Sequence, residues 1–166
     1  MSMKFLSLFS VLILAACGFS PMYGNSSGAN ATAPEAGMDQ VAIAIIPDRE
    51  GQFLRNALID RFYSNGMPAN PAYELSFSKI NEGISDFDIT VDSEATRRQL
   101  KLSTTMTLTD NATKQIVLKR PLQAITSHNV LDSEFSTLVT EQSAREAALN
   151  DLARQAERQI ALYFSR

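Results

Sequence analysis

The sequence contains one thiol, Cys17, and one imidazole, His128, and these two side chains limit the chemistry that it can perform. A thiol beside an imidazole could act as a nucleophile, because the imidazole accepts the thiol proton. Cys17, however, directly follows the apolar run Phe5–Leu14 and two small residues. We therefore predict that this thiol is acylated rather than catalytic. We predict that His128 is a surface or strand-end histidine rather than a metal ligand.

The first seventeen residues have the pattern of a bacterial lipoprotein signal. Lys4 supplies a basic start, and the apolar run is shorter than the roughly 20 residues of a membrane-spanning helix. Leu14-Ala15-Ala16-Cys17 resembles the lipobox, in which the cysteine receives a diacylglycerol and the signal is cut just before it. Several acyl chains together make a stable membrane anchor. Residue 18 is Gly rather than Asp, which in lipoproteins resembles the signal for export to the outer membrane. The alternative is an incidental cysteine after an ordinary secretory signal.

The pattern divides the chain into three segments. We predict that residues 1–16 are a lipoprotein signal peptide, that residues 17–40 are an acylated N-terminus and flexible linker, and that residues 41–166 are a single compact domain. Residues 24–38 have no apolar periodicity and are rich in Gly, Ser, Asn and Ala, which is typical of a linker. A composition of 45% hydrophobic and 20% charged residues suits one globular domain, and a net charge of −3 gives no reason to expect nucleic-acid binding.

No catalytic motif is present. The sequence lacks a Gly-rich phosphate loop, a Gly-x-Ser-x-Gly elbow and a His-Glu-x-x-His pair, and we expect neither an enzyme nor a bound metal or cofactor. An acidic stretch invites a calcium interpretation, but the Asp-x-Asp-x-Asp-Gly spacing is missing. We predict that this stretch is a solvated loop; its members are Glu82, Asp86, Asp88, Asp92 and Glu94.

The charge is distributed unevenly, because residues 97–120 hold six basic side chains against Asp110 alone. In an alternating strand pair, Arg97, Lys101 and Lys119 share a face with the hydroxyls of Ser103, Thr105, Thr107 and Thr109, whereas Arg98 lies on the apolar side. A basic, hydroxyl-rich face suits an anionic, phosphorylated, sugar-bearing partner. The alternative is edge protection, since charged residues also prevent exposed strands from aggregating.

The remaining pattern predicts an α/β fold of the α+β sandwich type. Residues 41–46 form a continuous apolar run that indicates a strand buried on both faces. Asp48 can cap a helix that ends near Asn65-Gly66, and residues 73–79 alternate as a second strand parallel to the first. The last helix has two possible starts: the capping box Ser143-Ala-Arg-Glu146, or an earlier start near Ser133 or Ser136, which we favour because Leu138 and Val139 continue the apolar pattern. Its apolar stripe is expected at Leu149, Leu152, Ala156, Ile160 and Tyr163.

Residues 100–108 and 116–124 each place apolar side chains at even positions, which predicts an antiparallel pair. Its expected register sets Leu108 opposite Ile116, Met106 opposite Leu118, and Leu102 opposite Leu122, with Asp110 across from Lys114 at the turn. Pro121 indicates that its strand is an edge or bulged. The whole is one mixed sheet of about four strands covered by two helices, in the order β-α-β-β-β-α.

Three segments resemble the lipopolysaccharide-assembly lipoprotein family LptE in its alphaproteobacterial form. They are Cys17-Gly-Phe-Ser-Pro-Met-Tyr-Gly24, Ala95-Thr-Arg-Arg-Gln-Leu100 and the helix from Phe135 to Phe164. The resemblance implies a compact, non-catalytic α/β domain. That domain would be lipid-anchored on the periplasmic side of the outer membrane, would plug the LptD barrel and would help deliver lipopolysaccharide. Contacts of Arg97, Arg98, Lys101 and Lys119 with lipopolysaccharide are a hypothesis.

Three other functions compete with this one. The main alternative is a lipoprotein scaffold subunit of another envelope assembly machine. A lipocalin-like carrier needs eight strands, more than the pattern supplies. A cell-wall enzyme would need a pair of carboxylates that nothing in the sequence singles out.

Overall fold

The domain starts with a parallel β–α–β unit, as the sequence predicts. Strand β1 (Val41–Ile43) pairs in parallel with β2 (Tyr73–Phe77), and helix α2 (Asp48–Phe62) connects them. The computed structural model describes residues 37–63, 66–89, 95–130 and 133–165, so the expected signal peptide and acylation site lie outside the described residues. Residues 38–40, the last three of the expected linker, form a short 3-10 helix whose Met38 is buried in the core.

The expectation that residues 41–46 form a strand buried on both faces is wrong. The strand ends at Ile43, and the side chain of Ile45 is 86% exposed. The burial pattern of β1 is that of a strand covered on one face, because Val41 and Ile43 are buried and Ala42 between them is only partly so. In addition, β1 is an edge strand of the sheet. The hydroxyl of Tyr63 donates to the Val41 carbonyl at 2.9 Å and accepts from the Ile43 N–H at 3.0 Å. It thereby satisfies the backbone groups on the free side of the strand.

The start of α2 also differs from the expectation, because Asp48 does not cap it. The N-cap residue is Pro47, which makes no side-chain hydrogen bond, and Asp48 is the first helical residue with a φ of 68°. Gly51 allows the helix to approach the preceding chain closely. A Cβ at this position would lie 2.7 Å from Cγ2 of Ile46.

The sheet has five strands, one more than expected, and the α+β class is confirmed. Strand β4 (Ala95–Asp110) is central: β5 (Ile116–Asn129) runs along one side of it, and β2 and β3 (Asn81–Ile89) share the other. The element order is therefore β-α-β-β-β-β-α. The additional strand, β3, contains the first part of the acidic stretch that the sequence predicted as a solvated loop.

The β4–β5 register is shifted by two residues from the expected one. Leu108 lies opposite Leu118, and Leu102 opposite Ala124, with an irregularity next to Leu108. A shift of two keeps the same residues on the same face, so the predicted core face is correct except at Ile116, which is 60% exposed.

The turn between the two strands explains the shift. The Asp110 side chain accepts hydrogen bonds from the N–H groups of Thr113 and Ala112 at 2.9 and 2.8 Å, and these bonds, that from Thr113 most, hold the pKa of Asp110 below its ordinary value. Lys114 has a φ of 58°. As a result the N–H of Asp110 donates to the Gln115 carbonyl, and Lys114 does not face Asp110 as a cross-strand partner.

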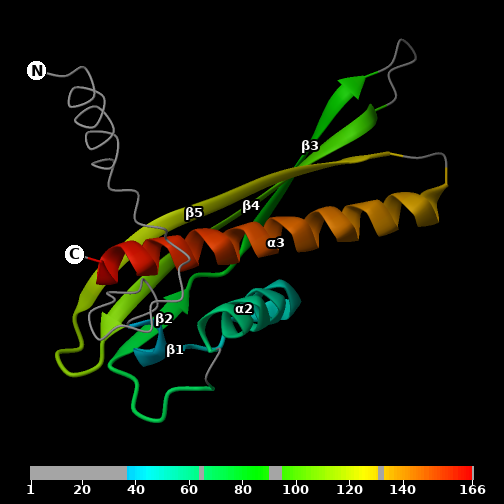
Figure 1. The fold of residues 1–166 in the computed structure, drawn as a ribbon. Helices are drawn as coiled ribbons and strands as arrows, with labels where there is room; N and C mark the ends of the chain where they lie inside the picture. The colour runs from blue at the N-terminus through cyan, green and yellow to red at the C-terminus, as the bar shows by residue number, and fades with distance from the viewer. Residues whose placement is uncertain (1–36, 64–65, 90–94, 131–132, 166) are drawn as a thin grey trace, which may run out of the picture. The chain divides into compact units, whose positions relative to one another are not determined.

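Both helices cover the same face of the sheet (Figure 1). Helix α3 (Glu134–Phe164) begins after its N-cap Ser133, which confirms the earlier of the two possible starts, and its 31 residues span about 46 Å. Its predicted stripe is confirmed as the buried side, with Leu152 and Ile160 fully buried and Tyr163 only partly so. No helix in the described part of the chain is long and apolar enough to cross a membrane.

Candidate functional site

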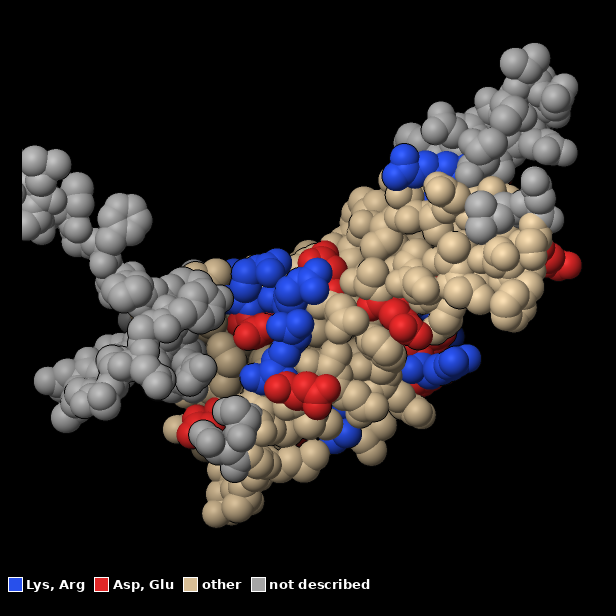
Figure 2. Space-filling model, turned by 45° about the vertical axis from the view of Figure 1, so that its right-hand side comes forward, with Lys and Arg blue, Asp and Glu red and all other residues tan. Residues whose placement is uncertain are grey.

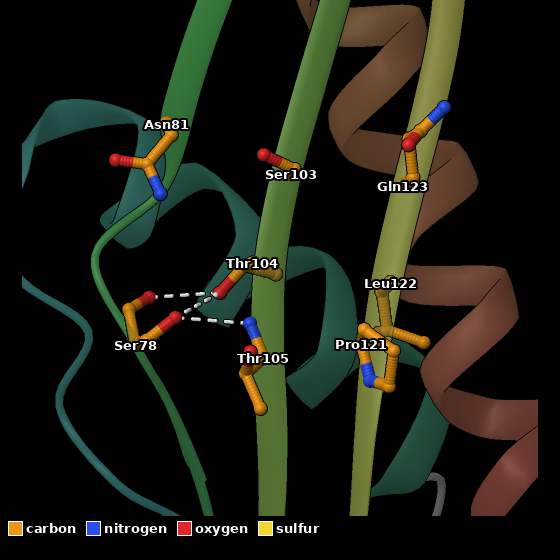
Figure 3. Close-up of a pocket in the computed structure, with 8 residues that line it drawn as sticks. All are labelled: Ser78, Asn81, Ser103, Thr104, Thr105, Pro121, Leu122 and Gln123. Carbon is orange, nitrogen blue, oxygen red and sulfur yellow. Dashed lines mark hydrogen bonds between the residues drawn. The ribbon is translucent and has the colours of Figure 1, made fainter.

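The second face of the sheet, which we call the open face, is formed by odd-numbered residues of β3 (81–85), β4 (97–109) and β5, together with Glu74 and Ser76 of β2, which lie opposite Thr109 and Thr107. The even-numbered residues of β4 from Leu100 to Leu108 are buried under the helices, so the alternation of the strand places its odd residues on the opposite side. The helices lie behind the strands when the sheet is viewed from the open face (Figure 3). This face therefore positions side chains that the core does not use.

Three of the four predicted basic residues lie on the open face. Arg97 and Lys101 are exposed on β4, and Lys119 is exposed on β5 opposite Thr107. Arg97 donates to the Ser127 hydroxyl at 3.0 Å. At about 3.3 Å per residue, Lys101 lies about 13 Å from Arg97 and about 20 Å from the row of Lys119. The three cations thus line the sheet lengthwise and do not converge on one point.

Arg98 lies on the other face and is neutralised there. Its Nε atom is 3.0 Å from Oδ1 of Asp86, which is its cross-strand partner on β3. Arg98 is therefore not on the open face, and the carboxylate of Asp86 balances its charge on the helical side of the sheet.

Several cations of the helical side are likewise paired with acids. Ion pairs join Arg61 to Glu157 and Arg154 to Asp151, and Figure 2 shows acidic side chains beside most of the basic ones that it presents. Within the described residues, neither Lys101 nor Lys119 forms an ion pair, and Arg97 contacts only a hydroxyl. The open face therefore keeps its positive charge available.

The acidic residues Glu82 and Asp86 were expected in a solvated loop, but they lie in β3 and form ion pairs. Glu82 accepts two hydrogen bonds from Arg145 of α3, at 2.9 and 2.8 Å. Arg145 also donates to Glu141, one turn earlier on its own helix. This network fastens β3 to α3. Within the described residues, no group of His, Cys, Asp or Glu side chains could hold a metal ion.

The Glu82–Arg145 contact predicts a pH-dependent stability. Hydrogen bonds from Arg145 lower the pKa of Glu82 below its ordinary value of 4.5. A lowered pKa in the folded state adds stability that is present above the unfolded value and is lost as the pH falls through the folded value. We expect Glu82→Gln to cost about 1 kcal/mol at neutral pH. Denaturant unfolding at pH 7 and pH 3 should show that this difference shrinks in acid.

The matched control is Glu74→Gln on β2, whose exposed carboxylate forms no ion pair within the described chain. It should change stability little at either pH. A Glu82→Gln cost that stays constant from pH 7 to pH 3 would contradict the ion-pair interpretation.

His128 is not a surface histidine. It lies next to the last residue of β5, as expected of a strand-end histidine, but it is only 5% exposed. Neither ring nitrogen has a hydrogen-bond partner among the described residues.

A pocket of about 330 Å³ lies beside the break between β2 and β3 (Figure 3). The Thr104 hydroxyl donates to the Ser78 carbonyl at 2.8 Å, and the Ser78 hydroxyl accepts from the Thr105 N–H at 2.9 Å. These bonds tie the β2–β3 connection to β4. The other lining residues are Asn81, Ser103, Pro121, Leu122 and Gln123.

The sequence analysis did not single out three of these lining residues, Asn81, Thr104 and Gln123. Asn81 belongs to the unpredicted β3, and the expected register placed Pro121, not Gln123, opposite Ser103. The polar residues at positions 81 and 85, on either side of Gly83, are the signal that could have indicated an open strand face.

Comparison with known proteins identifies the family. The model of the lipopolysaccharide-assembly family LptE matches residues 38–163, which is nearly the whole described domain. The chain belongs to the LptE family. The LptE family is not enzymatic, and membership gives this chain a role in lipopolysaccharide assembly in the cell envelope.

Solved structures agree on the fold. A lipoprotein from Caulobacter crescentus is 22% identical, with a TM-score of 0.63, covering 80% of this chain and 96% of that one. A minor lipoprotein from Acinetobacter baumannii is 21% identical, with a TM-score of 0.56 and coverage of 74% and 88%. Lipoprotein B from Nitrosomonas europaea is 14% identical, with a TM-score of 0.52 and coverage of 75% and 82%. No protein of curated function matches the chain.

Proposed function

We propose that this LptE-family protein is an outer-membrane lipoprotein, anchored through Cys17, that plugs the LptD barrel and presents its open face to lipopolysaccharide. Family membership supports the assembly role, and the sheet supports the plug. The interior of a large outer-membrane barrel is polar. A domain with hydroxyl, amide and basic side chains on one sheet face and charged side chains on the outer side of its helices fits such a polar lumen.

The proposed lipopolysaccharide contact rests on one observation: Arg97 and Lys101 lie on the central strand β4 and have no acidic partner among the described residues. Edge protection explains Lys119, because β5 is paired only with β4 and is an edge strand, as Pro121 predicts. It does not explain Arg97 or Lys101. Both lie in the part of β4 that pairs with β3 on one side and β5 on the other, where there is no edge to protect. Binding of a phosphorylated partner would explain why all three positions carry a positive charge.

The triple replacement of Arg97, Lys101 and Lys119 by Gln tests this contact. It removes charge but keeps length and polarity, so we expect a normal melting temperature. We expect lipopolysaccharide affinity to fall about tenfold at low salt, because three exposed charge contacts of up to about 1 kcal/mol each are lost. The remaining binding should depend less on salt. Titrations of the acylated protein in detergent, at low and high salt, measure both effects.

A charge-matched control is the triple replacement of Arg49, Arg154 and Arg158 by Gln on the exposed side of the helices. This variant should bind lipopolysaccharide like the wild type. Full affinity of the open-face variant at both salt concentrations would remove the lipopolysaccharide contact from this face.

A further inference from the structure

Three polar side chains form one row across the open face. Asn81 of β3 lies opposite Ser103 of β4, and Ser103 lies opposite Gln123 of β5. Because neighbouring strands are about 4.8 Å apart, the row is about 10 Å wide. We call Asn81, Ser103 and Gln123 the amide row. Figure 3 shows its members along one side of the pocket.

The amide row keeps its hydrogen-bonding capacity free. Ser78 and Thr104, on the neighbouring wall, use their hydroxyls to hold the β2–β3 connection. In contrast, no side chain of the row forms a hydrogen bond within the described residues. Each carboxamide offers two donors and an acceptor, and the hydroxyl offers one donor and an acceptor. The row therefore presents alternating donors and acceptors to a ligand.

Two apolar side chains and a glycine lie beside the amide row. Pro121 lines the pocket next to Gln123, and Ile125 is 52% exposed at the next open-face position of β5. Gly83 follows Asn81 on the open face, and nothing lies within 4 Å of where a Cβ would be. No charged side chain lines the pocket. Lys101 lies one row away, about 7 Å along β4 from Ser103.

This combination matches the chemistry of a neutral sugar. A pyranose ring carries hydroxyls that both donate and accept hydrogen bonds, together with C–H faces that pack on apolar side chains. A phosphate or carboxylate would need a cation, which the pocket lacks. A purely apolar ligand would leave the amides unpaired, which is costly.

We propose that the amide row is a binding site for a neutral saccharide unit, separate from the cations of the open face. The proposal deepens the proposed function and rests on it in one respect, namely that the ligand brought to this face carries sugars. In this arrangement Asn81 and Gln123 bind ring hydroxyls and Pro121 packs against a C–H face. The cations take the phosphates of the same ligand.

The probe for this proposal is a neutral hexose oligosaccharide, free of phosphate and of acidic sugars, titrated into the acylated full-length protein in detergent. We expect the wild type to bind it with an affinity that is insensitive to salt. Replacement of both Asn81 and Gln123 by Ala should weaken binding about tenfold, through the loss of several neutral hydrogen bonds. The matched control is the replacement of Gln52 and Asn56, exposed on α2, by Ala, which should leave binding unchanged.

Melting curves establish that each variant is folded, and Ser103→Ala provides a smaller change in the same row if the double variant is unstable. Absence of oligosaccharide binding by the wild type, or undiminished binding by folded row variants, would overturn the proposal. The open-face variant, in which Gln replaces Arg97, Lys101 and Lys119, distinguishes failure of this proposal from failure of the proposed function. It should lose affinity for intact lipopolysaccharide and keep its affinity for the neutral oligosaccharide.

Discussion

Leu152→Ala should lower the melting temperature by about 10 °C or more. Leu152 is 0% exposed on the inner side of α3. Truncation of a buried leucine to alanine costs about 2–5 kcal/mol, from the lost burial and from the cavity that remains. A domain has a total stability of only about 5–15 kcal/mol. A thermal melt followed by circular dichroism measures the shift.

The same substitution at Leu162 is the control, because this leucine lies on the same helix but is 58% exposed. Leu162→Ala should shift the melting temperature far less, since little apolar area leaves contact with the core. Equal shifts for the two variants would mean that α3 presents a different side to the sheet.

Cys17→Ala should abolish acylation completely. Cys17 is the only cysteine in the chain, so no second thiol can accept the diacylglycerol. Without the acyl group the precursor should remain uncleaved or reach the wrong compartment, because the membrane anchor is lost. Metabolic labelling with a radioactive fatty acid, followed by gel electrophoresis, measures the modification.

The control here is Gly18→Ala, which keeps the thiol and should remain labelled. Fatty-acid label that persists in Cys17→Ala would contradict the lipobox interpretation and favour an incidental cysteine.

The core of the fold was predictable because apolar periodicity reports burial. The stripe of α3 and the even positions of β4 show it: each places side chains on one face, and the structure buries that face against the other layer. The parallel β1–β2 pair followed from the handedness of the connection. The expected length of β1 was wrong because a run of apolar residues does not show whether the strand lies at the centre or at the edge of a sheet.

Strand β3 was missed because its inward face carries charge. Glu82 and Asp86 point toward the helical side, where Arg145 and Arg98 balance them. A rule that places polar residues in loops cannot detect such a strand, since the compensating cations lie far away in the sequence. The amide row was not predicted because it combines β3 with the two-residue register shift of β5, and the alternation within β4 indicates neither.

The cations were predictable as residues of one face, but their surroundings were not. The sequence placed Arg97, Lys101 and Lys119 together by alternation, and the register of β4 and β5 confirms that they share a face. It did not show that they are spread along the sheet without acidic partners. The acidic side chains of the helices cannot pair with these cations, because both helices cover the opposite face of the sheet.

The most direct test of the proposed role is co-purification from outer membranes solubilised in mild detergent, with the tagged full-length protein as bait and mass spectrometry as the readout. We expect the LptD barrel to be recovered with the wild type and with the open-face variant. Recovery should fail for Cys17→Ala, which does not reach the membrane. Recovery of the components of a different envelope machine, with no LptD, would contradict the proposed plug and favour a scaffold subunit.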